Sequence, residues 1–179
     1  LVRSRGLGDV YKRQILHSPQ EKLPDNLYLI AHVRGFLLFV QPIQKGQGAV
    51  SLKSIPEGIL TLTLLDGNYV PHSERLVFVR QNHSTWQLAS DKASYGSRLP
   101  ISLNIHLSDL SGQPIKGDFS LSITDNYAIR CDSTADNILS NLLLTSDIKG
   151  YIETPGYYFK DNSQRLKACL DNLMITQGW

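Results

Sequence analysis

The histidines and cysteines are the residues of this chain that could most readily bind a metal or act as nucleophiles. Zinc sites space their ligands a few residues apart. The five histidines are scattered instead, and none lies within such spacing of another: His17, His32, His72, His83 and His106. Cys131 and Cys169 lie far apart and form no Cys-x-x-Cys motif. We therefore predict no metal site.

Both cysteines are interpreted as buried thiols, because free cysteine is often buried. Cys169 lies on the apolar side of a predicted helix, together with Leu166, Leu170 and Leu173. A disulfide between Cys131 and Cys169 stays open as an alternative if the compartment is oxidising.

The sequence contains no pattern typical of a catalytic or phosphate-binding site. No Gly-x-Ser-x-Gly elbow occurs, and residues 45–48 (KGQG) lack the spacing of a phosphate-binding loop. Three acids near the end of the chain, Glu153, Asp161 and Asp171, have no spacing that brings them to the short separation of paired catalytic carboxylates. The prediction is a protein that is not an enzyme, with no catalytic residue and no cofactor.

Aromatic side chains gather in one short stretch near the end of the chain. Tyr151, Tyr157, Tyr158 and Phe159 lie within nine residues of sequence, 151–159. Aromatic residues contribute much of the energy of protein interfaces, so this cluster is a candidate interaction surface. Packing between two helices explains it equally well, and both interpretations stay open.

Composition and charge indicate an ordinary globular protein. Hydrophobic residues make up 41% and charged residues 19% of the chain, and the net charge is +2. Part of this charge comes from the first fourteen residues, where Arg3, Arg5, Lys12 and Arg13 are opposed only by Asp9. Without a basic stripe we predict no nucleic-acid partner. No apolar run reaches the roughly 18 residues of a transmembrane helix, so we predict no direct membrane span.

Residues 1–14 (LVRSRGLGDVYKRQ) are basic and lack an apolar pattern. From Ser4 to Gln14 they resemble the in-frame translation of a transposon-type sequencing adapter. We interpret residues 1–14 as a non-native, adapter-derived segment, which is set aside before fold reasoning. The native sequence is then expected to begin near Ile15.

Short runs of alternating apolar and polar residues, separated by turn residues, predict a β-rich fold. In residues 59–65, Leu60, Leu62 and Leu64 alternate with Thr61 and Thr63, the period of two of a half-buried strand. Residues 101–108 alternate in the same way and place His106 on the solvent side. Residues 119–124 repeat the alternation. Strands at this spacing are typical of antiparallel β-sandwiches.

The period changes to that of helices after Arg130. Apolar residues from Ile138 to Leu143 recur at helical spacing, and Ser133 with Asp136 has the form of a capping box. Gly150 is expected to end this helix, and residues 151–159 are expected to be extended, with a turn at Pro155. A last helix is predicted from Ser163 to Ile175.

The predicted fold class is therefore mainly β, with antiparallel β-sandwich modules and two C-terminal α-helices. The predicted organisation has three parts: the adapter-derived segment 1–14, a partial sandwich module 15–81, and a second module 82–179 that includes the helical C-terminal segment and is truncated.

Three stretches carry a resemblance to a known family: residues 32–40 (HVRGFLLFV), residues 55–79 (IPEGILTLTLLDGNYVPHSERLVFV), and residues 142–159 together with 170–179. They resemble a family of Bacteroidetes cell-envelope proteins in which macroglobulin-like (MG2-type), immunoglobulin-like β-sandwich domains accompany a TonB-dependent receptor plug domain. Residues 91–125 are similar to the start of an MG2 domain, with Tyr95, Gly112, Pro114 and Ile115 at the matching places.

The resemblance implies a location and an architecture more than an activity. It implies a non-catalytic structural or interaction part of an outer-membrane-associated protein, in the periplasm or outer membrane, with protein partners of the cell envelope and a link to TonB-dependent uptake. No Cys-Gly-Glu-Gln thioester motif occurs, so protease trapping is not implied. The alternative is an accessory fragment of an envelope peptidase or carbohydrate-active enzyme whose catalytic domain is missing.

Overall fold

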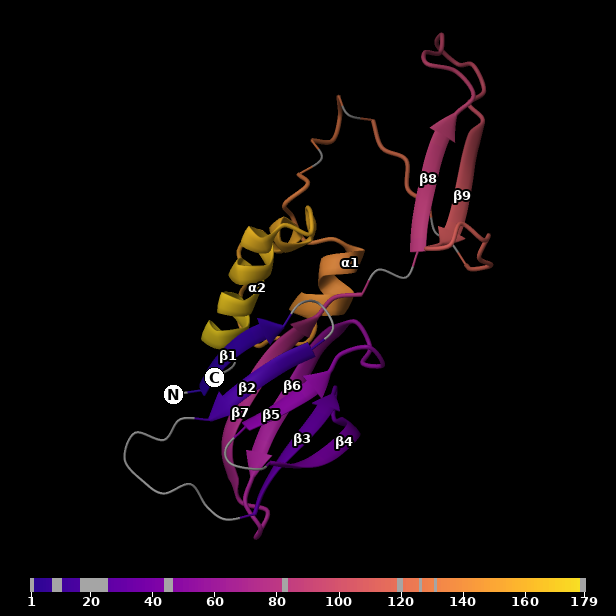
Figure 1. The fold of residues 1–179 in the computed structure, drawn as a ribbon. Coiled ribbons are helices and arrows are strands. Elements are labelled where there is room, and N and C mark those ends of the chain that lie inside the picture. The colour runs from indigo at the N-terminus through magenta and orange to yellow at the C-terminus, as the bar shows by residue number, and fades with distance from the viewer. Residues whose placement is uncertain are drawn as a thin grey trace. The chain divides into compact units, whose positions relative to one another are not determined.

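The computed structural model of this chain describes residues 2–7, 11–16, 26–43, 47–81, 84–118, 121–125, 127–130 and 132–177. Figure 1 shows their fold. The chain divides into two compact units, of which the first combines Leu1–Arg80 with Asp132–Trp179 and the second contains Gln81–Cys131. The first unit is therefore built from two separate parts of the sequence.

The strands of the first unit form two antiparallel sheets. Sheet A has the order β1-β2-β5, and sheet B has the order β4-β3-β6-β7. The strands of sheet A are β1 (Val2–Leu7), β2 (Tyr11–Leu16) and β5 (Gln47–Ser51), and those of sheet B are β3 (Leu27–Val33), β4 (Phe36–Ile43), β6 (Gly58–Leu65) and β7 (Pro71–Val79). Strand β1 and part of β2 fall within residues 1–14, whose origin as an adapter stays a prediction.

The alternation predicted for β6 is confirmed. Leu60, Leu62 and Leu64 are at most 6% exposed. Leu60 and Leu62 belong to the core on the face of sheet B that packs toward sheet A. The other members of this core come from β3, β5, β7 and the loop after β5: Leu29, Ala31, Val50, Leu52, Ile55, Val77 and Val79. Each leucine buried in this way stabilises the fold by roughly 1.5–3 kcal/mol. The contact between the two sheets is the layer that a β-sandwich requires.

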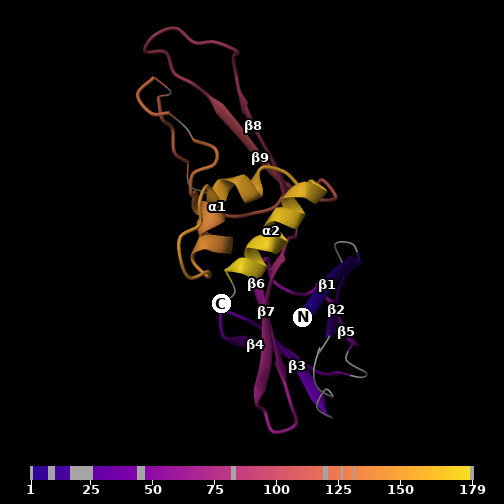
Figure 2. The ribbon, with the colours of Figure 1, turned by 90° about the vertical axis from the view of Figure 1, so that its left-hand side faces the viewer.

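A helical layer covers the opposite face of sheet B (Figure 2). It consists of four segments: α1 (Ile138–Ser140), the π-helix η1 (Asn141–Thr145), the 3₁₀-helix η2 (Pro155–Phe159) and α2 (Gln164–Thr176). A second core lies between these helices and the strands, and its buried members are Ile59, Leu144, Ile148, Ile152, Leu170 and Met174. The sequence-based division joined residues 132–179 to the second module, whereas in the structure residues 132–177 pack on sheet B of the first unit.

Helix α2 forms as its sequence predicts. The Ser163 hydroxyl accepts a hydrogen bond from the Leu166 amide at 3.3 Å, which caps the first turn. Leu166, Leu170 and Met174 are buried along one stripe. Cys169 is a free thiol of intermediate burial on this helix, and Cys131 lies outside the described residues.

The start of the first predicted helix differs from the expectation. The cap is Asn137, whose side chain accepts from the amides of Leu139 and Ser140, while the Ser140 hydroxyl accepts from the Asn137 amide. The predicted Ser133–Asp136 box does not form, because Asp136 accepts from the Ser140 hydroxyl instead. The helix then widens into η1 and ends at Thr145. Gly150 has φ of +94°, the left-handed conformation that was predicted, but it follows a turn and not the helix itself.

The segment from Pro155 to Phe159 was expected to be extended, and it is a 3₁₀-helix. Proline is favoured in the first turn of a helix, because its fixed φ suits the helix and its missing N–H is not needed there. Tyr158 and Phe159 of this helix pack against the core between the helices and sheet B.

The second unit contains, within its described residues, a two-stranded antiparallel sheet of β8 (Ser84–Ser90) and β9 (Leu103–Asp109). His106 is exposed, as predicted. Residues 121–125 form no strand, so the third alternating strand is absent over that range. Its first two residues lie outside the described part of the chain. The predicted fold class, mainly antiparallel β with two C-terminal helices, is confirmed for the part of the chain that the structure describes.

Candidate functional site

The structure distributes the four aromatic residues of the predicted cluster between the core and the surface. Phe159 packs edge to face on Phe78 of β7, with ring centroids 5.9 Å apart, and Tyr158 packs against the same core. Tyr157 contacts Tyr158 at 5.6 Å in a T-shaped arrangement. Tyr151 is 84% exposed. Tyr151 is therefore the member of the cluster whose ring is most available to a partner.

Burial has an electrostatic consequence at Tyr158. Desolvation raises the pKa of its phenol above the ordinary value of 10.0, so the hydroxyl is neutral at physiological pH. A neutral, partly buried tyrosine serves packing and does not act as a base.

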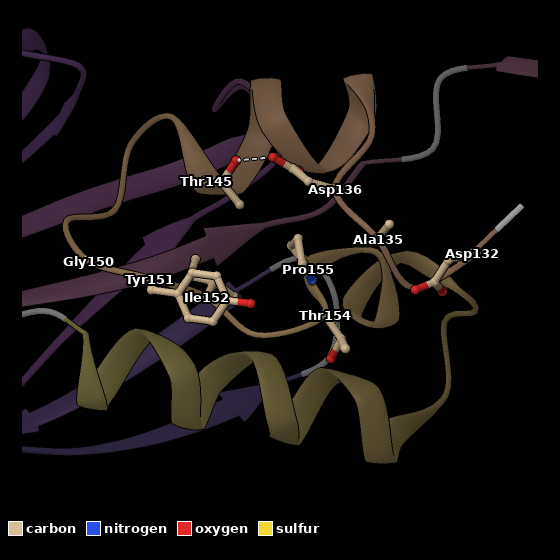
Figure 3. Close-up of a pocket in the computed structure, with 9 residues that line it drawn as sticks. All are labelled: Asp132, Ala135, Asp136, Thr145, Gly150, Tyr151, Ile152, Thr154 and Pro155. Carbon is tan, nitrogen blue, oxygen red and sulfur yellow. Dashed lines mark hydrogen bonds between the residues drawn. The ribbon is translucent and has the colours of Figure 1, made fainter. Parts of the chain in front are cut away.

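Tyr151 lies at an open pocket with a volume of about 430 Å³ (Figure 3). The pocket belongs entirely to the segment that follows the second unit. Its lining residues are Asp132, Ala135, Asp136, Thr145, Gly150, Tyr151, Ile152, Thr154 and Pro155. Two carboxylates, two threonines and one tyrosine supply its polar groups. This pocket is the candidate site of the first unit.

The Asp136 carboxylate accepts hydrogen bonds from three side chains of the helical segment α1–η1 that follows it. It accepts from the hydroxyl of Ser140, from the Asn141 amide group at 3.4 Å, and from the hydroxyl of Thr145 at 3.2 Å. Figure 3 shows the last of these bonds as a dashed line across the pocket. The Ser140 hydrogen bond is the largest cause that lowers the pKa of Asp136 below the ordinary 3.8. Asp136 is therefore ionised at neutral pH and is unsuited to act as a general acid.

Asp132 behaves in the same way at the other end of the pocket. Its carboxylate accepts from the Thr134 hydroxyl at 2.6 Å and from the Thr134 amide at 2.8 Å. These bonds lower its pKa, and the hydroxyl has the largest effect. A catalytic acid requires a pKa raised toward neutrality. The pocket therefore offers a fixed negative charge and no proton donor of that kind.

The other acids considered in the sequence do not come together in the site. Asp171 forms an ion pair with Arg75 at 3.0 Å. Asp161 caps the turn before α2, and the Ser163 hydroxyl is the main cause that lowers its pKa. Glu153 is exposed. Among the described residues, no group of three or more histidine, cysteine or acidic side chains could hold a metal ion.

The histidines are likewise dispersed. His72, the second residue of β7, contacts the carboxylate of Asp66 in the preceding turn at 3.1 Å. His32 is partly buried in β3, and its Nδ1 atom has no hydrogen-bond partner among the described residues. His17 and His83 lie outside the described residues.

Arginine residues of sheet B, which sequence reasoning did not single out, bind the helical layer. Arg34, in the turn between β3 and β4, donates to the Asp147 carboxylate at 3.0 Å and to the carbonyl oxygen of Leu142. Arg75 of β7 donates to Asp171 of α2 at 3.0 Å. These contacts join positions about a hundred residues apart. No local pattern in the sequence predicts them.

Arg80 makes a third contact of this kind. Its guanidinium donates to the carbonyl oxygen of Asp161 at 2.9 Å and lies 5.7 Å from the centre of the Phe159 ring. A cation over an aromatic face contributes roughly 0.5–1 kcal/mol where it is exposed. The end of β7 is thereby tied to the segment that leads into α2.

Comparisons with protein families, with curated proteins and with solved structures found no match to this chain. Within the described part of the chain, no helix is long and apolar enough to cross a membrane.

The hydrogen bonds of Asp136 predict a pH dependence of stability. Its folded pKa lies below the ordinary 3.8, so the ionised form stabilises the fold. This contribution is complete above the unfolded pKa and is lost as the pH falls through the folded pKa. We expect the Asp136→Asn variant to be less stable than the native chain at neutral pH and to lose less stability between about pH 5 and about pH 2.

Urea unfolding at several pH values measures this difference. The Asp118→Asn variant, at an exposed position of the second unit, is the control. Parallel acid profiles for the native chain and the Asp136→Asn variant would contradict the expectation.

Proposed function

We propose that this chain is a non-catalytic structural and interaction part of a cell-envelope protein, located in the periplasm or at the outer membrane. In this proposal its sheets are macroglobulin-type, immunoglobulin-like sandwich modules, and the whole protein serves TonB-dependent uptake. Two observations support the proposal. Three sequence stretches resemble the family, and charged residues of these stretches form ion pairs with one another.

The observation that carries the proposal is that the polar residues of these stretches bind one another. Arg34 belongs to the first stretch and binds Asp147 of the last. Arg75 belongs to the middle stretch and binds Asp171 of the last. Residues that are used in this way hold layers of a scaffold together. These ion-paired side chains do not converge on one site, as the side chains of an active site do.

An interaction role needs an exposed contact residue, and Tyr151 is the residue we assign to it. Its ring is 84% exposed beside the pocket. Tyrosine supplies a large contact area at low cost in conformational entropy. A protein partner with a basic or hydrogen-bond-donating group beside an apolar patch would suit a pocket that contains the Asp132 and Asp136 carboxylates.

Fractionation of cells that carry the gene, followed by chemical crosslinking, tests the proposal. We expect the protein in the envelope fraction, crosslinked to an envelope protein. The Tyr151→Ala variant should lose most of this crosslinking without a change in melting temperature, whereas Tyr127→Ala, at another fully exposed tyrosine, should keep it. Recovery in the cytosolic fraction, or equal crosslinking by both variants, would contradict the proposal.

A further inference from the structure

The edges of sheet B are protected against pairing with other strands. Strand β7 carries the charged residues Glu74 and Arg75 at its middle, and α2 packs beside it. Strand β4 contains Pro42, and its pairing with β3 has a bulge next to Ala31. Charge, proline and bulges are the devices by which proteins prevent edge-to-edge association.

Strand β8 of the second unit has none of these devices. Its sequence, Ser84–Ser90 (STWQLAS), contains no charged residue and no proline. Its pairing with β9 runs without a register shift. Among the described strands, β9 is the only one that pairs with β8. An isolated two-stranded hairpin is marginally stable in water, and further strands are needed for independent stability.

The apolar side chains of this hairpin gather on one face. Residues directly opposite each other in an antiparallel pair lie on the same face. Trp86 lies opposite Leu107, and Leu88 lies opposite Ile105. Trp86 is 69% exposed, Leu88 57% and Ile105 43%. The other face carries Gln87 opposite His106.

The backbone of β8 directs the hydrogen-bonding groups of these apolar residues toward the edge that pairs with no other described strand. The carbonyl oxygen of Leu107 accepts from the amide of Ile115 at 3.1 Å, on the side of β9 that faces away from β8. The Trp86–Leu107 pair is therefore one of the pairs without mutual hydrogen bonds, and such pairs alternate with bonded ones. It follows that Trp86 and Leu88 point their N–H and C=O groups outward.

Residues at equal distances before and after Gln87 in β8 are similar in size and polarity. Ser84 and Ser90 are the ends, Thr85 and Ala89 are small, and Trp86 and Leu88 flank the centre. Antiparallel pairing of two β8 strands centred on Gln87 places Trp86 of each strand opposite Leu88 of the other. These are the residues whose outward groups would hydrogen-bond. No like charges oppose each other along this edge.

We propose that β8 is a homodimerisation edge, whose occupant is the β8 strand of a second copy of this chain. The product is a four-stranded antiparallel sheet with one continuous apolar face. This inference goes beyond the proposed function, because it assigns a second interaction surface with a different partner. It is tested on the purified chain, so its outcome is independent of the assignment to the cell envelope.

Analytical ultracentrifugation of the purified 179-residue chain with two charge variants tests the inference. Gln87→Lys places two like charges directly opposite each other at the centre of the pairing. His106→Lys adds the same charge to the same face, one strand farther from the centre. We expect the native chain and His106→Lys to sediment as dimers, and Gln87→Lys to sediment as a monomer with an unchanged circular dichroism spectrum.

A crosslinking experiment adds positional resolution. Pairs without mutual hydrogen bonds bring Cα atoms to about 4.5 Å, within the range for a disulfide. In a background where Cys131 and Cys169 are replaced by serine, Gln87→Cys should form a covalent dimer under mild oxidation, and Ala89→Cys should not. A monomeric native chain, a dimer that persists in Gln87→Lys, or equal crosslinking by both cysteine variants would overturn the proposal.

Discussion

Replacement of Gly156 by alanine is expected to destabilise the first unit by about 3 kcal/mol. Gly156 donates its N–H to the carbonyl oxygen of Thr134 at 2.9 Å. A Cβ atom on Gly156 would lie 2.6 Å from the carbonyl oxygen of Ala135 and 2.8 Å from that of Ser133. All these atoms belong to backbone, so no side-chain rotation relieves the overlap. The loop 133–135 or the start of η2 must move.

Urea unfolding of the Gly156→Ala variant measures this loss, and Gly67→Ala is the matched control. At Gly67 the nearest atom to a new Cβ would be the Cβ of Asn26 at 3.5 Å, an ordinary contact. That substitution should change stability by less than about 1 kcal/mol. Equal stability of the two variants would mean that the close approach of η2 to residues 133–135 does not exist in solution.

Truncation of Leu144 to alanine is expected to cost about 3 kcal/mol. Leu144 is 0% exposed and lies in the core between η1 and sheet B, with Ile59 and Met174 among the members. Removal of its side chain leaves a cavity that neighbouring strands cannot fill, because sheet B is fixed on its other face by sheet A.

Leu142 provides the control for this experiment, since it lies in the same π-helix and is 54% exposed. The Leu142→Ala variant should lose no more than about 0.5 kcal/mol of stability. A similar loss for both leucines would show that η1 does not pack on sheet B in the orientation described.

The local pattern of the sequence was sufficient to predict strand β6 and the last helix. In β6, a period of two placed Leu60, Leu62 and Leu64 on one face, and burial confirms it. In α2, helical spacing placed Leu166 and Leu170 on the apolar side, and both are buried. Both predictions depend only on which side chains must leave water, which is a property of neighbouring residues in the chain.

Local patterns did not predict which element packs against each apolar face. A stripe on α2 indicates that a face is buried but does not say against which element. The one signal available was in β7, where Leu76, Val77, Phe78 and Val79 are all apolar, the pattern of a strand covered on both faces. The helical layer covers Leu76 and Phe78, and the sheet-to-sheet core contains Val77 and Val79.

The candidate site was predicted only in part for a related reason. The aromatic cluster was visible as a run of residue types, but the 3₁₀-helix sends Phe159 into the core, whereas Tyr151 stays exposed before it. The ion pairs of Arg34 and Arg75 depend on the packing of distant segments. Such contacts follow from the complete fold and have no local signature.

The central claim is that sheet B and the helical layer of residues 132–177 form one scaffold. Native-state hydrogen exchange of the Leu144→Ala variant tests this claim most directly. The account predicts that amides of β6 and of α2 lose protection together, by the same free energy of opening. Loss of protection in α2 with unchanged protection in β6 would contradict it, since the helices would then be a separate element attached to an independently stable sandwich.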